Sequence, residues 1–369
     1  MTTMTTMTTT EPDTNSGELV ADRLIRDVTT VLETLSTHLG LRLGLFAGLH
    51  DLGPSTSTSL ASHAGVDTRY TREWCEQQTV AGMVTCLDPT QAPTDRVFAL
   101  SEGVSDALLV DDSGAWVAPL VELLPGITDV LDTLATAWQT GSGVPFHAYG
   151  APIRHGLGDL NGVAFTSALP EWLASVPGLM ARLDQPGAQV LDLGCGTGRS
   201  SLAIARMAPR ARVLGVDLDP ASIDEAVAAA RAAGLDDRVH FVVADAANLE
   251  VEPGSHTLVT VFEAIHDMGD PVGALRTARR ALESGGVCYV ADERVADEFG
   301  PEASVVERLQ YGFSVLHCLP ATRAEDPVVA HGTVLRAPTL GGWARDAGFA
   351  PLERLEVDDP FWQHYLLPA

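Results

Sequence analysis

Short apolar runs alternate with segments of helical periodicity along the second half of the chain. The apolar runs are AQVLDL, ARVLGVD, RVHFVVAD, HTLVTVF and GVCYVADE. We interpret them as strands, and the segments Arg199–Ala208, Pro220–Ala233 and Pro271–Leu282 between them as helices. Because these strands are apolar along their whole length, the pattern predicts a parallel sheet covered by helices on both faces. Two further runs, FAPLERLEV and PFWQHYLLPA, have no helix between them and predict an antiparallel hairpin at the edge of the sheet.

The pattern from residue 17 to residue 103 is helical first and extended afterwards. Apolar residues recur at helical spacing from Gly17 to Gly53, and two shorter helices are predicted before and after a turn at Gly65. The stretch DPTQAPTDRVFALSEG then has the turn residues of a hairpin that closes on VFAL. Two helices around a turn, followed by a hairpin, are typical of a winged helix.

Residues 106–185 are predicted to be mostly helical, with one interruption at the glycine-rich stretch QTGSGVPFHAYGAPIRHG. A long loop inside a connecting segment often closes over a ligand. The patterns together divide the chain into a disordered polar tail over residues 1–16, an all-helical winged-helix domain over 17–105, a helical linker and substrate lid over 106–185, and a doubly wound α/β domain over 186–369.

The net charge argues against nucleic acid and anionic membranes as partners. The sequence has 23 basic residues (Lys plus Arg) against 49 acidic ones, so its formal charge at pH 7 is −26. Residues 1–105 alone hold 6 arginines against 13 acidic residues. Because an acidic surface repels phosphate backbones and anionic lipid heads, the winged helix is expected to serve dimerisation or to act as a substrate lid, and not to bind DNA.

The same reading predicts a cytoplasmic protein. No run approaches the roughly 18 apolar residues that a membrane span needs, and the start of the chain lacks the cationic and apolar regions of a signal peptide. The five cysteines are odd in number and have no C-x-x-C spacing. Neither a disulfide framework nor a cysteine-rich zinc site is therefore indicated.

The stretch VLDLGCGTG, from Val190 to Gly198, is the most specific motif of the chain. A predicted strand ends with Asp192 and Leu193, and three glycines then turn the backbone into a helix. Glycines accept a left-handed backbone and let a ligand approach the bare main chain. The spacing G-x-G-x-G differs from the G-x-G-x-x-G of dinucleotide sites, and no G-K-[ST] follows, so a phosphate-binding loop is not indicated.

Two more acidic residues end the next predicted strands. Asp217 closes the second strand, where a carboxylate can accept hydrogen bonds from ribose hydroxyls, and Asp245 closes the third, where it can accept one from an exocyclic amine such as that of adenine. The carboxyl ends of parallel strands lie at the edge where doubly wound sheets bind their ligands. Taken singly, each acidic residue could instead cap a helix.

These residues resemble the class I S-adenosylmethionine (SAM)-dependent methyltransferases, whose signature is a strand followed by D-x-G-x-G-x-G. The resemblance implies a Rossmann-like, doubly wound sheet of seven strands with a reversed last strand. It also implies a cofactor, SAM, whose methionine part, ribose and adenine lie along this edge of the sheet. The residues expected at the cofactor are Tyr149, Asp192, Gly194, Gly196, Gly198, Asp217, Leu218, Asp245, Ala246, Phe262 and Glu263.

With the winged helix in front, the whole chain resembles bacterial and plant small-molecule methyltransferases, which dimerise through that domain. The resemblance implies a homodimer that methylates a small molecule, most simply as an O-methyltransferase of secondary metabolism. Transfer to carbon, nitrogen or sulfur of a small keto, amino or thio acid is the alternative. A transcription regulator that senses SAM through the same fold is a third reading, and the acidic winged helix argues against it.

The stretch VFEAIHDMGDP places His266 and Asp267 directly after the fourth predicted strand. In a methyltransferase sheet this position faces the transferring methyl, and a histidine is suited to act there as a general base at neutral pH. Asp267 is expected to orient His266 or to start the next helix. His317, in YGFSVLHCLP, lies on a predicted helix that follows the fifth strand and is the second catalytic candidate.

A metal is an alternative role for the two histidines. The chain also resembles winged-helix α-keto-acid C-methyltransferases, which hold iron with two histidines in comparable segments. His266 and His317 could do the same if they face one cavity. Two ligands do not define a metal site by themselves, so no metal is assigned from the sequence.

Overall fold

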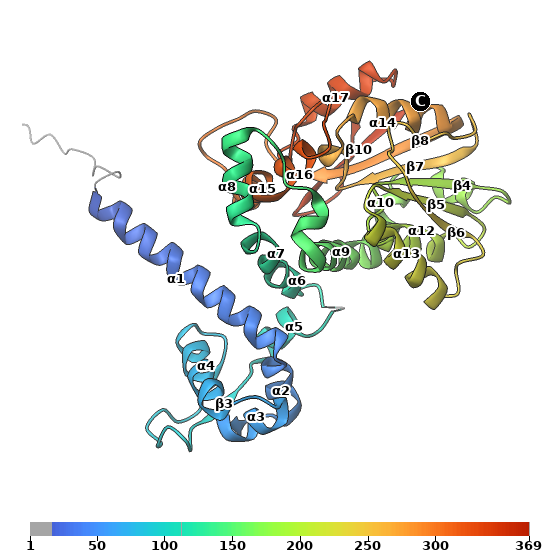
Figure 1. Ribbon diagram of the computed structural model, residues 1–369. Helices are drawn as coiled ribbons and strands as arrows, with labels where there is room; N and C mark the ends of the chain where they lie inside the picture. Colours follow the sequence, from blue (N-terminus) through green and yellow to red (C-terminus); the bar gives the residue numbers. More distant parts are fainter. Residues whose placement is uncertain (1–16, 112, 369) are drawn as a thin grey trace, which may run out of the picture. The chain divides into compact units, whose positions relative to one another are not determined.

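The computed structural model describes residues 17–111 and 113–368 and divides into two compact units between Val121 and Glu122 (Figure 1). The tail predicted to be disordered, residues 1–16, lies outside the described residues. The domain boundaries expected near residues 105 and 185 stay predictions. Each unit is described by itself below.

The first unit begins with two helices, α1 (Gly17–Arg42) and α2 (Leu45–Leu52), which Gly44 separates with a left-handed backbone (φ 69°). The predicted helix-turn-helix follows as α3 (Ser57–Ala64) and α4 (Thr68–Val80). The turn at Gly65 is again left-handed, with φ 68°. This part of the predicted winged helix is confirmed.

A small antiparallel sheet completes the winged helix. Its strands β1 (Ser55–Thr56), β3 (Val97–Ala99) and β2 (Thr85–Cys86) pair in that order. The pairing of β2 with β3 confirms the predicted hairpin that closes on VFAL, and it means that the domain is mainly helical but not all-helical. The strands form because Phe98 turns its side chain into the core that α2, α3 and α4 share.

A run of short helices leads to the large sheet. After α5 (Glu102–Leu108) come α6 (Ala118–Glu122), α7 (Leu124–Thr128), α8 (Leu131–Thr140), the 3-10 helix η1 (Phe146–Tyr149), α9 (Gly150–Ser167), α10 (Leu169–Ala174) and α11 (Leu179–Leu183).

The long glycine-rich loop expected over residues 139–156 is wrong in its extent. Only residues 141–145 lie between helices, because the chain is helical again from Phe146. These residues are also held in place, since Val144 N–H donates to the carbonyl of Pro320 at 2.9 Å and a Cβ on Gly143 would overlap the backbone of Ala324. Gly143 therefore serves close packing.

The second unit contains the predicted seven-stranded sheet, with strand order β6-β5-β4-β7-β8-β10-β9. Its five parallel strands are β4 (Gln189–Leu193), β5 (Arg212–Asp217), β6 (Val239–Val243), β7 (His256–Phe262) and β8 (Leu282–Glu293). The predicted edge hairpin is present as β9 (Glu353–Arg354) and β10 (Trp362–Pro368), and β10 runs antiparallel to β8. The direction of the strand order changes between β4 and β7, which is where doubly wound sheets bind their ligands.

Helices cover both faces of this sheet. Figure 1 shows α9, α10, α12 (Arg199–Met207) and α13 (Pro220–Ala232) on one face, and α14 (Pro271–Ala281) and α17 (Ala337–Asp346) on the other. Adjacent residues of one strand enter different cores: Val190 packs with Trp172 on the first face, and Leu191 packs with Leu275 on the second. The apolar strands thus bury both faces of the sheet, as their sequences predict.

A helical insertion between β8 and α17 carries His317, as predicted. It consists of α15 (Val305–Phe313), the π-helical turn η3 (Ser314–Cys318) and α16 (Leu319–Arg323). A single π-helical turn inside a longer helix is rare and often lies at a functional site. Among the described helices, none has the length and apolar character to cross a membrane.

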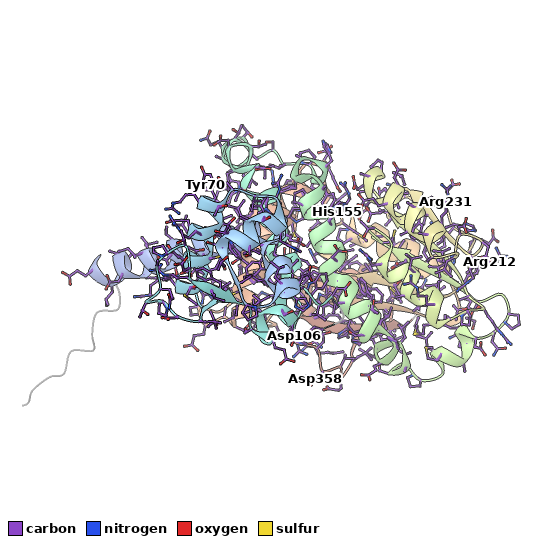
Figure 2. The ribbon with its side chains drawn as sticks, turned by 90° about the horizontal axis from the view of Figure 1, so that it is seen from below. Tyr70, Asp106, His155, Arg212, Arg231 and Asp358 are labelled. Carbon is purple, nitrogen blue, oxygen red and sulfur yellow. The ribbon has the colours of Figure 1, made fainter. Side chains whose placement is uncertain are left out.

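Charged side chains lie on the outside of this unit (Figure 2). Arg212 on β5, Arg231 on α13, His155 on α9 and Asp358 before β10 are all exposed. His155 and Arg154 both contact the carboxylate of Glu225, at 3.1 and 2.8 Å. His155 is therefore a surface residue in an ion pair and lies outside the candidate site.

Candidate active site

The glycine loop between β4 and α12 folds over the carboxyl end of β5. The backbone N–H groups of Gly194 and Cys195 donate to the carbonyl of Val216, at 2.8 and 3.0 Å. The N–H of Gly196 donates to Oδ2 of Asp217 at 2.8 Å. The predicted glycine loop therefore contacts Asp217, the acidic residue that was predicted to lie at the same ligand site.

The three glycines have left-handed backbones for different reasons. Their φ angles are 73°, 50° and 79° at Gly194, Gly196 and Gly198. A Cβ on Gly194 would overlap the side chain of Ala264, and one on Gly198 would lie 2.7 Å from the ring of Phe241. A Cβ on Gly196 would meet no described atom within 4 Å. The first and third glycines thus serve packing, and Gly196 is where a ligand can approach bare backbone.

Asp192 supports the loop from inside. It is 1% exposed and accepts hydrogen bonds from the hydroxyls of Ser200, Ser201 and Thr260 at 2.6 to 2.7 Å. Burial raises the pKa of its carboxyl, although the three hydroxyls act to lower it. These three hydrogen bonds join β4 to α12 and β7 and give Asp192 a structural role. Its predicted contact with the cofactor stays a prediction.

Asp217 lies at the end of β5 with its carboxylate against the glycine loop. Besides the Gly196 bond, its Oδ1 accepts from the N–H of Asp219 at 2.9 Å, and burial raises its pKa. Asp219 is the residue that caps α13, through the N–H of Ser222. The capping alternative therefore does not apply to Asp217. Leu218, the other residue predicted here, is 48% exposed.

Asp245 follows β6 and orders its own loop. Its Oδ1 accepts from the N–H of Ala247 at 2.9 Å and its Oδ2 from the side-chain amide of Asn248 at 2.6 Å. Ala246 beside it is 8% exposed. No helix follows Asp245 directly, so here too the capping alternative does not apply.

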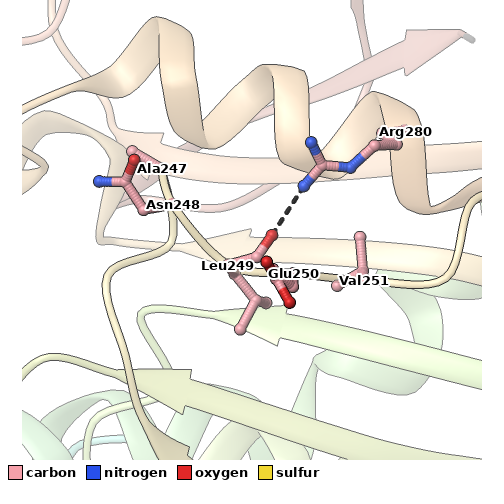
Figure 3. A pocket seen from close by; sticks show the side chains of 6 residues that line it. All are labelled: Ala247, Asn248, Leu249, Glu250, Val251 and Arg280. Carbon is pink, nitrogen blue, oxygen red and sulfur yellow. Dashed lines mark hydrogen bonds between the residues drawn. The ribbon is translucent and has the colours of Figure 1, made fainter.

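A recess of about 450 Å³ lies beside this loop (Figure 3). Arg280, from α14, reaches across it and donates to the carbonyl of Leu249 at 2.7 Å. The lining residues are Ala247, Asn248, Leu249, Glu250, Val251 and Arg280. None of the residues predicted for the site belongs to this lining, so the recess is separate from the predicted site.

His266 lies in the 3-10 helix η2 (Ile265–Asp267), directly after β7, and is 2% exposed. Its Nδ1 is 2.9 and 3.0 Å from the two carboxylate oxygens of Asp292, which is 1% exposed at the end of β8. Burial acts to lower the pKa of His266, but the negative charges of Asp292 and Asp267 outweigh it and hold this pKa well above the usual value. This arrangement fixes Nδ1 as the bonded nitrogen and leaves Nε2 for other contacts.

Sequence reasoning missed Asp292 as the partner of His266. The available signal was the end of the run GVCYVADE, because the carboxyl ends of β7 and β8 are neighbours in a parallel sheet. The roles expected of Asp267 fall to other residues: Asp292 orients His266, and Asp270 caps α14 by accepting from the N–H of Gly273 at 2.8 Å. Asp267 lies with its Oδ1 3.5 Å from Nε2 of His266.

His317 is enclosed by aromatic rings. Its ring centroid is 4.6 Å from that of Tyr149 and 5.6 Å from that of Phe146, and it is 1% exposed. Its Nδ1 lies 3.4 Å from Sγ of Cys318, and its Nε2 has no hydrogen-bond partner among the described residues. Burial lowers the pKa of His317, which keeps the imidazole neutral.

Tyr149 is buried against the segment that carries His317. Its hydroxyl donates to the carbonyl of Leu316 at 2.9 Å, and the residue is 2% exposed. Phe262 is also a core residue, with its ring centroid 5.5 Å from Phe165 and 5.9 Å from Tyr289. The contacts of Tyr149 and Phe262 with the cofactor stay predictions.

Glu263 has an unusual backbone and a buried carboxyl. Its φ of 50° is left-handed, which is uncommon for a residue with a side chain and marks strain that surrounding contacts maintain. Burial raises the pKa of its carboxyl to about 7, and the carboxyl of Glu293 is hydrogen-bonded to it. Burial and the charge of Glu263 raise the pKa of Glu293 well above its usual value.

One group of side chains could hold a metal ion. His266, Asp267 and Cys318 each offer a ligand atom, and these atoms lie within 4.8 Å of one another. Cys318 follows His317 in the π-helical turn, and its thiol is hydrogen-bonded to His266. His317 is not part of this group, so the pair of histidines expected from the sequence is not the set of ligands that the structure brings together.

Two segments of the chain match known protein families. Residues 184–326 match the family described as Methyltransferase domain, and residues 32–101 match the Rv2258c-like winged HTH domain. The first segment contains the glycine loop, Asp217, Asp245, His266 and Cys318. The second contains the helix-turn-helix and its hairpin.

Individual relatives resemble parts or all of the chain. A ubiquinone biosynthesis O-methyltransferase of Xanthomonas oryzae pv. oryzae is 38% identical over 114 residues, which are 30% of this chain and 45% of that protein. A 27-O-demethylrifamycin SV methyltransferase of Amycolatopsis mediterranei is 29% identical over 144 residues, 39% of this chain and 52% of that one. The chain thus spans about half the length of these curated relatives.

A solved structure resembles the chain over nearly its whole length. Human N-acetylserotonin methyltransferase in complex with SAM covers 98% of this chain and 99% of its own, with a TM-score of 0.68 and 15% identity. At this identity the likeness establishes the fold. The chain therefore carries a methyltransferase domain with the seven-stranded, doubly wound fold behind an Rv2258c-like winged-helix domain.

Proposed function

We propose that this protein transfers a methyl group from SAM to a hydroxyl of a small molecule. The observation that carries the proposal is the arrangement at the carboxyl ends of four neighbouring strands. Open backbone at Gly196 follows β4, the carboxylate of Asp217 ends β5, and the His266–Asp292 pair joins the ends of β7 and β8. Such an edge is where a doubly wound sheet binds its ligand.

The proposed cofactor site uses the residues around the glycine loop. The backbone at Gly196 approaches the methionine part of SAM, and Asp217 accepts the ribose hydroxyls. Each oxygen of Asp217 accepts one backbone N–H in the structure and retains a second lone pair for a hydroxyl. Asp245, whose loop lies at the next strand, is assigned to the adenine amine. SAM supplies the electrophile, a methyl group on a positively charged sulfur.

The proposed acceptor site is built on His266. Because Asp292 holds Nδ1, Nε2 is the nitrogen of His266 that is left for the acceptor hydroxyl. The raised pKa of His266 keeps Nε2 protonated in the free protein. Nε2 therefore takes the hydroxyl proton only after it has lost its own, and the rate of methyl transfer is expected to rise with pH. The acceptor oxygen forms the bond to the methyl carbon while the carbon–sulfur bond breaks, and the sulfur leaves as a neutral thioether. Alignment of oxygen, carbon and sulfur is the main contribution of the protein to such a displacement.

An assay with trideuteromethyl-labelled SAM and a panel of phenols, hydroxy acids and keto acids tests this function. We expect one acceptor class to gain a labelled methyl on oxygen. His266→Ala is expected to lower kcat by about 10²–10⁴-fold, the usual contribution of a general base. Asp292→Asn is expected to lower kcat with little change in the KM for SAM, because Asp292 positions His266 and does not touch the cofactor.

Two results would contradict the proposal. Label on carbon, nitrogen or sulfur would replace the O-methyl assignment with the alternative acceptors. No labelled product from any acceptor class, with SAM bound, would contradict methyl transfer itself. Binding of the protein to the DNA that flanks its own gene in a gel shift would instead favour the regulator reading.

We propose a cytoplasmic homodimer, from the exposed apolar residues of helix α1 and from the free thiols of the cysteines. The exposed apolar face of α1 supports a homodimer through the winged-helix domain, with Leu24, Ile25, Val28, Val31 and Leu32 between 57% and 64% exposed. All five cysteines are free thiols. This matches a reducing compartment, so we place the protein in the cytoplasm.

A further inference from the structure

Three potential metal ligands of different chemistry converge from two separate segments. His266 and Asp267 belong to the 3-10 helix η2, and Cys318 is the last residue of the π-helical turn η3, 51 positions after Asp267 in the chain. Their ligand atoms lie within 4.8 Å of one another. His266 and Cys318 are 2% and 7% exposed, so two of the three lie in the interior.

The spacing of the first two ligands matches a tetrahedral ion. Nε2 of His266 and Oδ1 of Asp267 are 3.5 Å apart. Two ligands at about 2.0–2.2 Å from a tetrahedral Zn²⁺ lie about 3.4 Å apart. Sγ of Cys318 lies within 4.8 Å of a ligand atom of His266 and of one of Asp267.

The residues around these three side chains, Asp292 and His317, make the contacts that usually support metal ligands. A metal-bound histidine almost always donates its other ring N–H to a carboxylate, and Nδ1 of His266 contacts both oxygens of Asp292. Oδ1 of Asp267 is buried and has no hydrogen-bond partner among the described residues. Nδ1 of His317 lies 3.4 Å from Sγ of Cys318 and can donate to a thiolate there. The group that faces this oxygen is the imidazole of His266, with Nε2 3.5 Å away, and a dication bound between the two would take the place of the imidazole proton.

We propose that His266, Asp267 and Cys318 form a binding site for a transition-metal dication. One imidazole, one carboxylate and one thiolate match Zn²⁺ best, and three protein ligands leave a fourth position open. Ca²⁺ and Mg²⁺ are excluded because they require oxygen ligands. His317 supports the thiolate in this site and is not itself a ligand.

Metal binding stands independently of methyl transfer, and only its consequence rests on the proposed function. A dication with an open position beside the acceptor acidifies an oxygen that it binds. In the loaded protein, His266 then holds the metal in place of the proton. Loading is accompanied by loss of two protons to the buffer, the thiol proton of Cys318 and the Nε2 proton of His266, because these groups ligate as a thiolate and a neutral imidazole.

The test is a titration of tag-free, chelator-treated protein with CoCl₂ and with ZnCl₂. We expect one ion per chain, a thiolate-to-cobalt charge-transfer band in the near ultraviolet, and release of about two protons per Zn²⁺, one from His266 and one from Cys318, read by calorimetry in two buffers of different ionisation enthalpy. Cys318→Ser is expected to abolish the band. Asp292→Asn is expected to weaken Zn²⁺ binding by about 10–100-fold.

Controls make the outcome specific. Cys86→Ser, in the winged-helix unit, is expected to keep the band and the affinity unchanged. If Cys318→Ser does not fold, Asp267→Asn takes its place, because this side chain is 34% exposed; weaker Co²⁺ binding is expected. A band that survives Cys318→Ser, or wild-type protein that binds no Co²⁺ or Zn²⁺ at one per chain, would overturn the proposal. Protein that binds S-adenosylhomocysteine but no metal contradicts only this inference, and the reverse result contradicts only the proposed cofactor.

Discussion

At Gly194 and Gly196 the backbone has the same left-handed conformation, but the surroundings of the two residues differ. Gly194 faces the side chain of Ala264, and Gly196 faces no described atom within 4 Å. A side chain in this conformation costs about 1–2 kcal/mol at either position. Only at Gly194 does an added methyl also overlap protein atoms, which adds about 1–3 kcal/mol. The two glycines should therefore respond differently to the same substitution.

We expect Gly196→Ala to lower the free energy of unfolding by about 1–2 kcal/mol and to weaken cofactor binding at least about 10-fold. Gly194→Ala should lose about 2–5 kcal/mol, the sum of both costs. Urea denaturation measures the stability, and calorimetric titration with S-adenosylhomocysteine measures the binding. Equal stability losses in the two variants, with binding intact in Gly196→Ala, would contradict this account of the loop.

The sequence could predict the site residues that directly follow or end an apolar strand. Gly196 and Asp217 follow from the strand-loop-helix pattern, and His266 from its place after an apolar strand. Asp292 could not be assigned as the partner of His266, because their contact depends on which strands are neighbours in the sheet. The role of Asp192 was also out of reach, because its three hydroxyl partners come from two separate elements.

At the scale of single elements, helix α1 has an apolar stripe that its own unit does not cover. Leu24, Val28 and Val31 share one face at helical spacing, with exposed fractions of 57% each. The helix has 26 residues and so is about 39 Å long. An exposed apolar stripe of this kind indicates a protein interface, and a second copy of α1 is the partner in the proposed dimer.

Val28→Glu places a charge in the middle of this stripe and is expected to convert the dimer to monomer. Thr30→Glu adds the same charge to the opposite, polar side of α1, where Thr30 is exposed, and should leave the dimer intact. Light scattering coupled to size-exclusion chromatography measures the mass of each variant. If wild type is already monomeric at micromolar concentration, the stripe has another function.

The edge hairpin β9–β10 depends on one acidic residue, Asp359, between its two strands. Oδ1 of Asp359 accepts from the N–H groups of Phe361 and Trp362, at 2.8 and 2.9 Å, and Oδ2 is 3.7 Å from Nε2 of His364. Burial acts to raise the pKa of Asp359, but these donors outweigh it and lower the pKa. A lowered pKa in the folded state stabilises the protein above the unfolded value of about 3.9, and this stability is lost as the pH falls toward the folded value.

Asp359→Asn should therefore lower the free energy of unfolding at pH 7 by about 1 kcal/mol, and flatten the decline of stability below about pH 4. The neighbouring Asp358 is exposed, so Asp358→Asn is the matched control and should follow wild type. Thermal denaturation across pH 3 to 7 measures both. An Asp359→Asn curve parallel to that of wild type would show that the hairpin does not depend on this charge.

Elements were easier to predict than loops because each strand and helix has its own apolar period. The strands of the sheet and its antiparallel edge follow from that period. The structure of the glycine-rich segment before α9 could not be predicted in this way. Composition alone does not reveal that Gly143 packs against the backbone of Ala324 or that Phe146 begins a helix. The β1 strand, two residues long, is also too short to leave a period in the sequence.

The whole molecule combines a winged-helix unit, which we propose for assembly, with an α/β unit, which we propose for methyl transfer. The charge of −26 fits a role in which the first unit meets a second copy and not DNA. The central claim, however, lies in the second unit: the edge formed by β4, β5, β7 and β8 binds SAM. Every role proposed for His266 in methyl transfer depends on that claim.

Calorimetric titration of the wild-type chain with SAM tests this claim most directly, with Asp217→Ala and the exposed control Asp224→Ala alongside. We expect one SAM molecule to bind per chain. We also expect about 100-fold weaker binding to Asp217→Ala, because two charge-assisted hydrogen bonds to the ribose are lost, and unchanged binding to Asp224→Ala. No heat of binding at millimolar SAM, or equal affinity in Asp217→Ala and wild type, would contradict this claim.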